Sequence, residues 1–239
     1  ANTTFWLETN LLPNTQYSRY AVAHNASGES DVSNSSSTYT LATVSAGLSA
    51  ASVYKTSATI SWDNVGATRY AVERATGVVS PTNWCYIVTW SSNITGTSFT
   101  DTGLSGETTY WYRIKSYNGD AVLTDTPSNQ ISVLTIPPAP SGFLGISIST
   151  YQINWSWADN SSYETGYRVK TSTYGIIATL SANTTFWIEP SLSANTQYTR
   201  YAVAYNVSGE SDVSNSSSAY TLANPPGAIG FNSIWLSSI

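Results

Sequence analysis

Residues 182–223 read ANTTFWIEPSLSANTQYTRYAVAYNVSGESDVSNSSSAYTLA, and the chain contains this stretch twice. Residues 1–42 are a near copy that differs at nine positions, each by an exchange that a strand or a turn tolerates. A third, diverged copy can be aligned with residues 97–134. Internal similarity at this length indicates structural modules in a row. The fold of one block therefore determines the architecture of the chain.

Alternating apolar residues and turn signals predict that the block is β structure. In residues 1–42 we expect strands over residues 3–8, about 17–25 and 36–41, separated by turns at 11–15 and 26–29. Three antiparallel strands cannot bury a core by themselves. The block must therefore be part of a larger β-sandwich.

A leucine, a turn and a tyrosine recur at one spacing in all three copies. The pairs are Leu11 and Tyr17, Leu104 and Tyr110, and Leu192 and Tyr198. This pattern, with the strand and Asn-containing turn that follow it, resembles the E–F corner and F–G hairpin of fibronectin type III modules. The resemblance implies that Tyr17, Tyr110 and Tyr198 are tyrosine corners, whose hydroxyl groups bind upstream backbone. We expect an all-β chain of tandem immunoglobulin-like (fibronectin type III) antiparallel β-sandwiches.

Alignment of the copies divides the chain into four parts. Residues 1–42 supply strands E, F and G of one module, 43–136 and 137–223 are complete modules, and 224–239 start a further module. The simplest interpretation is a window from a longer array. In the alternative, the start of the last module in one chain completes the open first block of the next chain by strand donation.

Composition excludes several classes of function. Only 10% of the 239 residues are charged, the net charge is −5, and Ser, Thr and Asn are abundant. The nine Lys and Arg residues are scattered, so no basic patch for nucleic acid or an anionic membrane is visible. No apolar run approaches the length of a membrane span. Cys85 is the only cysteine, so core packing must hold the modules together without internal disulfides.

No catalytic constellation is visible. His24, the only histidine, is replaced by Tyr205 in the second copy, which does not suit a general base or a metal ligand. Cys85 has no histidine near it in the sequence to activate the thiol. Acidic residues repeat in register between the copies, which indicates module architecture. Spaced calcium ligands and phosphate-binding glycine loops are missing. The sequence thus predicts a protein that is not an enzyme and uses no cofactor or metal.

Trp84, Tyr86 and Trp90 are the first candidate contacts for a partner or ligand. They lie in residues 77–92, a stretch longer than its counterpart 172–181 in the next module. Exposed aromatic rings can stack on sugars or anchor a protein. The alternative is that they cap the edge of the sandwich or pack on a neighbouring module.

An apolar stripe on strand F is the second candidate. Tyr20 and Val22, repeated as Tyr201 and Val203, should point to the outer face of the sheet, which is usually polar. The stripe predicts a covered face, and the cover could be a neighbouring module or another chain. High strand propensity alone is the alternative explanation.

Two arginines fall in the inward register of the same strand. Arg19 and Arg200 stand where the family usually has an apolar residue. Either each side chain reaches the end of the sandwich with its charged group, or the register is off by one locally.

These observations favour a non-catalytic structural role. We expect a repeat segment of an extracellular or cell-surface protein, such as a stalk, an adhesin or a filament subunit. Its expected partners are copies of itself or neighbouring modules, or else a cell-surface glycan or protein. The alternatives are accessory modules of a large secreted carbohydrate-active enzyme, and a glycan-binding or protein-binding module that uses Trp84, Tyr86 and Trp90.

Overall fold

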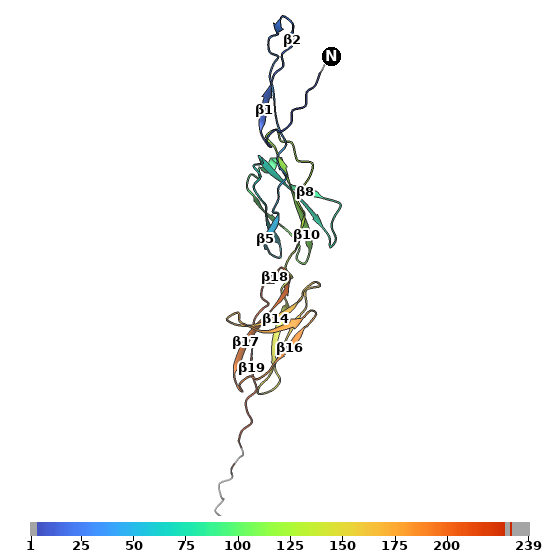
Figure 1. The fold of residues 1–239 in the computed structure, drawn as a ribbon. Helices are drawn as coiled ribbons and strands as arrows, with labels where there is room; N and C mark the ends of the chain where they lie inside the picture. The colour runs from blue at the N-terminus through green and yellow to red at the C-terminus, as the bar shows by residue number, and fades with distance from the viewer. Residues whose placement is uncertain (1–3, 228–229, 231–239) are drawn as a thin grey trace, which may run out of the picture. The chain divides into compact units, whose positions relative to one another are not determined.

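The computed structural model describes residues 4–227 and residue 230, and it divides into two compact units, residues 1–136 and 137–239 (Figure 1). In the described residues the regular structure is β-strand apart from one 3₁₀ turn, Trp90–Ser92. The expected all-β fold is confirmed. The predicted module start at 224–239, and with it the strand-donation alternative, lies mostly outside the described residues.

Residues 43–136 form a two-sheet sandwich. The first sheet has the order β5 (Ser49–Val53), β6 (Ser57–Ser61) and β9 (Ser98–Thr102). The second has the order β11 (Ile131–Leu134), β10 (Thr109–Tyr117), β7 (Arg69–Thr76) and β8 (Cys85–Val88). All neighbouring strands are antiparallel. The strands are therefore A, B and E on one sheet and G, F, C and C′ on the other.

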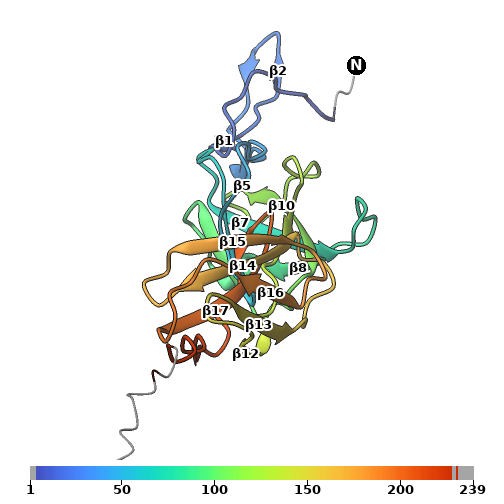
Figure 2. The same ribbon diagram turned by 90° about the horizontal axis from the view of Figure 1, so that it is seen from below.

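Residues 137–223 repeat this arrangement. The first sheet has the order β12 (Ser141–Ser147), β13 (Ile153–Ala158) and β16 (Phe186–Glu189). In the second, β15 (Ile176–Ser181), β14 (Gly166–Thr171) and β17 (Gln197–Asn206) lie side by side (Figure 2). The short strands β18 (Gly209–Glu210) and β19 (Ser217–Tyr220) both pair with β17.

Each sandwich has its own core, built by alternation along its strands. In β13 the side chains of Ile153, Trp155 and Trp157 point inward and are buried. In β10 the inward residues are Tyr110, Tyr112 and Ile114, and the residues between them are only partly buried. Burying a large apolar side chain contributes about 1.5–3 kcal/mol, so these alternating sets determine which face of each strand is inside.

Residues 1–42 form strands F and G without a sandwich around them. β1 (Gln16–Arg19) pairs with β4 (Ser36–Tyr39), and β2 (His24–Asn25) pairs with β3 (Gly28–Glu29). The expected E strand over residues 3–8 is not formed by residues 4–8, and residue 3 lies outside the described part. In the second copy, the same residues form β16 by pairing with β13. No described residue of unit 1 offers a strand B to the first block, so its E segment has no ladder to join.

Candidate binding surfaces

The three tyrosines at the recurring leucine spacing make the hydrogen bonds of a tyrosine corner. The hydroxyl oxygens of Tyr17, Tyr110 and Tyr198 accept the backbone N–H five residues upstream, at distances of 2.9, 2.9 and 3.0 Å. The bond fixes the loop that leads into strand F in each copy.

Trp84 and Trp90 each have one ring face covered by an arginine of the same module. The guanidinium of Arg113 lies 4.3 Å from the ring centroid of Trp84, and that of Arg69 lies 4.0 Å from the ring of Trp90. Tyr117 meets Trp90 edge to face, with 5.3 Å between centroids. Cation–π contacts of this kind stabilise the module itself, and they leave less ring surface for a ligand.

Tyr86, which lies between Trp84 and Trp90 in the sequence, is 45% exposed. It stands opposite Glu73 in the β7–β8 pair, and Glu73 binds Arg113. Burial raises the pKa of the Tyr86 phenol, and the nearby Glu73 carboxylate raises it further. Arg113 and Tyr117 are four residues apart in β10, or about 13 Å. The predicted aromatic row is thus divided between two clusters on the outer face of the sheet.

The apolar stripe on strand F is covered from within its own module. Tyr201 is 6% exposed and Val203 is 1% exposed. Their ladder partners in β14 are Lys170 and Arg168, and both of these long side chains bind Glu210. A partner chain therefore has no access to Val203, and Tyr201 keeps only a small exposed edge.

In residues 1–42 the same positions are open. Tyr20 is 64% exposed and Val22 is 39% exposed. The difference between the copies follows from strand C, which supplies the covering side chains in residues 137–223 and has no counterpart against residues 1–42 in the described structure.

Glu210 holds in place Lys170 and Arg168, the two side chains that cover the apolar stripe. Burial would raise the pKa of its carboxyl group, but the hydrogen bonds and charges of Lys170 and Arg168 outweigh this, and the pKa lies below its ordinary value. Arg168 also lies over the ring of Tyr205, 4.2 Å from its centroid. Glu210 thus holds the F–G hairpin against strand C.

Arg200 does point into the sandwich, where it forms an ion pair. Its Nη2 lies 2.6 Å from Oε1 of Glu189, and the two side chains are 11% and 8% exposed. The indole N–H of Trp155 donates to the other oxygen of Glu189 at 2.8 Å. The register is therefore as expected, and the buried carboxylate explains why an arginine replaces an apolar residue.

The first complete module has a similar device with different residues. Asp101, at the position of Glu189 in strand E, accepts hydrogen bonds from Arg74 at 2.9 Å and from the hydroxyl of Tyr112 at 2.7 Å. Burial, followed by this hydrogen bond, raises the pKa of Tyr112 well above its ordinary range. Sequence reasoning recognised the repeated acidic positions but not their buried partners.

A joint of polar side chains connects residues 1–42 to the module that follows. Asn14, which has a left-handed backbone (φ 44°), donates from Nδ2 to the carbonyl of Gly66 at 2.8 Å and to Oγ1 of Thr68 at 3.2 Å. Its Oδ1 accepts the N–H of Gly119 at 2.9 Å. One asparagine thus binds both the B–C and the F–G loops of the next module.

The F–G loop completes this module joint. One oxygen of Asp120 accepts the backbone N–H of Tyr39 at 2.7 Å and the hydroxyl of Thr38 at 2.9 Å. Nδ2 of Asn118 donates to the carbonyls of Tyr39 and Thr40 at 3.3 and 3.2 Å. The end of strand G in one module is therefore bound along three successive residues by the loop of the next.

Gly119 is required at the joint because the ring of Tyr39 lies against it. A Cβ atom at this position would lie 2.5 Å from the ring. The module 137–223 has Val207 at the equivalent position, where the side chain is 88% exposed. Sequence reasoning missed this joint, because the bonded residues are 52 to 105 positions apart.

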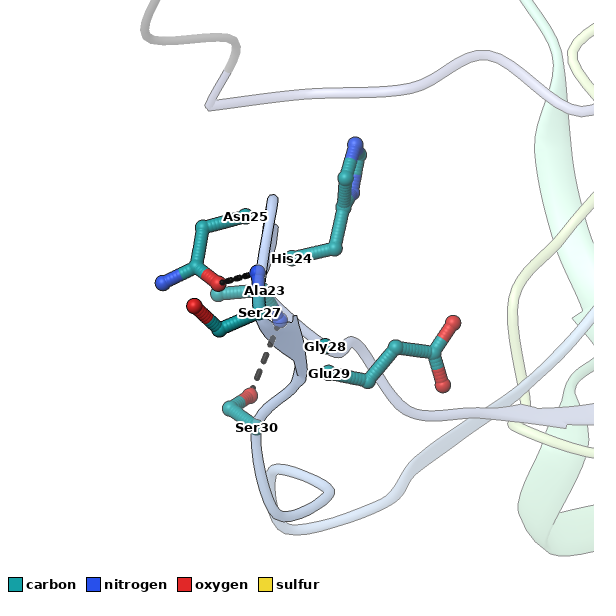
Figure 3. A pocket seen from close by; sticks show the side chains of 7 residues that line it. All are labelled: Ala23, His24, Asn25, Ser27, Gly28, Glu29 and Ser30. Carbon is teal, nitrogen blue, oxygen red and sulfur yellow. Dashed lines mark hydrogen bonds between the residues drawn. The ribbon is translucent and has the colours of Figure 1, made fainter.

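A shallow hollow in the F–G hairpin of the first block is shown in Figure 3. It measures about 360 Å³ and is lined by Ala23, His24, Asn25, Ser27, Gly28, Glu29 and Ser30. In the second copy β14 runs beside this hairpin, with Gly166 paired to Tyr205, and it binds Glu210, the equivalent of Glu29. The hollow therefore corresponds to the place of a β-strand.

The candidate catalytic groups lie apart from each other. Cys85 is exposed in β8 and His24 is exposed in β2. Among the described residues, no three His, Cys, Asp or Glu side chains gather in a way that could hold a metal ion. None of the described segments forms a helix long and apolar enough to cross a bilayer.

Comparison with known proteins finds a bacterial relative and several modular structures. Chitinase A1 of Niallia circulans is 31% identical over 184 residues, a match that covers 70% of this chain and 24% of that protein. The chain thus spans about a quarter of this relative's length. No protein-family model matches the chain.

Two solved structures are among those similar to this chain. A segment of two fibronectin type III domains from chicken tenascin has a TM-score of 0.45 and 21% identity, covering 74% of this chain and 99% of that one. The FN1–FN3 domains of chicken CNTN1 have a TM-score of 0.41 and 16% identity, covering 89% and 80%.

The assignment rests on the geometry of the chain itself. Both complete modules place strands A, B and E on one sheet and strands C′, C, F and G on the other. A tyrosine at the start of strand F ties back to the backbone in every copy. Both complete modules therefore have the immunoglobulin-like β-sandwich fold of a fibronectin type III domain.

Proposed function

We propose that the chain is a non-catalytic spacer segment of an extracellular or cell-surface protein, in which hydrogen bonds at a module joint hold successive modules in a fixed orientation. The observation that carries the proposal is the joint between residues 1–42 and 43–136. Its partners in this role are neighbouring modules of the same protein.

The hydrogen bonds of the joint are better suited to fixing the orientation of two modules than to binding them strongly to each other. Each of its hydrogen bonds contributes about 0.5–1.5 kcal/mol net, and most involve groups that also meet water. Asn14 binds the B–C and F–G loops of the next module, and Asp120 of the F–G loop binds strand G of the first block. These directional bonds restrict rotation about the linker. Such a joint makes a stiff connection between the first block and the module that follows it.

The extracellular location is supported by composition. The chain is weakly charged and rich in hydroxyl side chains. Its architecture of repeated sandwiches is common to surface proteins and secreted enzymes, and the match to a bacterial chitinase agrees with either.

Nuclear magnetic resonance relaxation of the full chain tests the joint. In the native protein, amides of residues 16–39 and of the module 43–136 should report the same rotational correlation time. Asn14→Ala should shorten the correlation time of the first block alone. Asn195→Ala is the matched control, because it makes the same change at the equivalent position of the second copy. Independent tumbling of the first block in the native protein would contradict the proposal.

A second candidate is an accessory segment of a secreted carbohydrate-active enzyme. It is favoured by the relative, which is named a chitinase and of which this chain matches 24%. A direct measurement is depletion of the chain from solution by insoluble chitin, with cellulose as the comparison. Selective depletion by chitin would favour the accessory role, whereas recovery of all the protein would favour a spacer.

A further inference from the structure

An open hollow lies on the outer face of the second sheet in residues 137–223. It measures about 310 Å³, which is at the lower end of the range for small-ligand sites. Three segments meet there: the turn after β14, the outer side of β17, and the stretch before β19. The lining residues are Ser172, Tyr174, Thr199, Tyr201, Val213, Ser214 and Ser216.

Tyr201 brings a buried hydroxyl group to this hollow. The residue is only 6% exposed, and its hydroxyl oxygen has no hydrogen-bond partner in the described structure. Burial raises the pKa of the Tyr201 phenol. The nearby Tyr174 backbone offsets part of that rise in pKa, but it does not meet the geometry of a hydrogen bond to the hydroxyl. Buried polar groups are almost always satisfied. This hydroxyl is shielded from solvent, so a partner from outside the chain reaches it only when the side chains at the hollow move aside.

Tyr174 provides an aromatic surface beside that hydroxyl. It is 66% exposed, and its ring meets Tyr201 edge to face at 5.3 Å between centroids. Its backbone is left-handed (φ 68°) and is held by its N–H bond to the carbonyl of Thr171 at 2.9 Å. An exposed, fixed tyrosine ring is a platform on which the C–H face of a sugar can stack.

The lining indicates the charge of the ligand. None of the residues that line the hollow carries a charged side chain, and the nearby Lys170 is paired with Glu210. The hydroxyl of Ser214 is already used, since it accepts the N–H of Ala202 and donates to the carbonyl of Asn215. The hydroxyls of Ser172 and Ser216 form no hydrogen bond within the described residues and remain available. The site therefore suits a neutral molecule that has both hydroxyl groups and an apolar face.

The other copies lack this combination. At the position of Tyr201, the module 43–136 has Arg113, whose guanidinium is covered by Trp84 and bound to Glu73. The first block has Tyr20, which is 64% exposed and has no counterpart of Tyr174 among the described residues. The hollow is thus particular to residues 137–223.

We infer that this hollow binds one neutral pyranose unit of a glycan, which stacks on Tyr174 and accepts or donates a hydrogen bond at the hydroxyl of Tyr201. The inference is independent of the spacer role, because the hollow shares no residue with the module joint.

The test is a titration of the isotope-labelled full chain with cellobiose, maltose and N,N′-diacetylchitobiose, each up to about 50 mM, since so small a site should bind with a Kd on the order of 1–10 mM. At least one sugar should shift the amide signals of Ser172, Tyr174 and Ser216 in a saturable manner. Tyr174→Ala should weaken binding at least about tenfold through loss of stacking. Tyr201→Phe, which keeps the ring, should weaken it about fivefold through loss of one hydrogen bond.

Tyr151→Ala is the matched control, because Tyr151 is an exposed tyrosine of the same module, 55% accessible, outside the hollow. It should leave the affinity unchanged. The inference is overturned if none of the three sugars shifts these amides, or if Tyr201→Phe and Tyr174→Ala bind as the native chain does. Either result leaves the relaxation test of the joint unaffected.

Discussion

The same carboxylate position in the E segment is used differently in the two near-identical blocks. Glu189 lies inside a closed sandwich and binds Arg200 and the indole of Trp155. Glu8 binds Arg19 at the same 2.6 Å, but those side chains are 26% and 49% exposed. Identical residues at an identical distance thus have different environments, and burial decides what each pair contributes.

Arg200→Met should therefore destabilise the module 137–223 severely. The substitution leaves the Glu189 carboxylate buried with the Trp155 N–H as its remaining hydrogen-bond donor among the described residues. Removing one member of a buried pair costs about 3–5 kcal/mol. Arg19→Met, the same change in the exposed pair, should alter stability little. Denaturant unfolding followed through resolved amide signals measures both. A loss in Arg200→Met no larger than in Arg19→Met would show that the buried pair is not a structural element.

At the scale of elements, Glu210 joins β18 to β14. Its folded pKa lies below the ordinary carboxyl value of 4.5 because Lys170 and Arg168 stabilise the ionised form. A lowered folded pKa gives stability that is present above the ordinary pKa and is lost as the pH falls through the folded pKa. The stability of unit 2 should thus decrease on acidification from about pH 4.5 downward.

Glu210→Gln should make that decrease less steep, because glutamine cannot titrate. Glu29→Gln is the control, since Glu29 has the same place in the first block and no ion pair among the described residues. Thermal melting between about pH 3 and 6 measures the effect. Equal acid dependence of the native chain and Glu210→Gln would mean that other carboxyl groups control the acid limb.

The sequence predicts elements best where their partners are nearby or repeated. Tyr17, Tyr110 and Tyr198 mark the start of strand F in each copy, because the corner needs only backbone five residues away. The E segment of the first block has the same sequence signal as β16, but no strand B among the described residues pairs with it, so residues 4–8 stay irregular. Strand propensity is a property of one segment, whereas a β-ladder forms only when two segments pair.

The candidate sites were harder to predict, because they depend on contacts between distant residues. The aromatic residues of 77–92 predict a surface that packs or binds, but nothing in that stretch identifies Arg69 and Arg113 as the groups that cover two of the rings. The hollow at Tyr201 depends on Tyr174, which comes from another turn. The alternation of residues in strand F does predict that Tyr201 lies on a covered outer face. That the cover comes from strand C of the same module is visible only in the structure.

At the scale of the whole molecule, the chain has separate hydrophobic cores. The cluster around Ile60 includes residues between Leu48 and Val133, and the cluster around Trp155 includes residues between Phe143 and Ala219. Neither contains a buried residue of the other. Cooperative unfolding follows shared packing, so the two complete modules should unfold as separate units.

Trp155→Ala tests this, because Trp155 is 0% exposed and central to its cluster. Removing it should cost about 3–5 kcal/mol, and the loss should be confined to amide signals of residues 141–220. Ile60→Ala is the reciprocal change, since Ile60 has the equivalent place in strand B, and it should affect only residues 49–134. If Trp155→Ala shifts the unfolding of both modules equally, their stabilities are coupled and separate cores do not make separate folding units. If each substitution affects only one module, the two cores fold independently of each other.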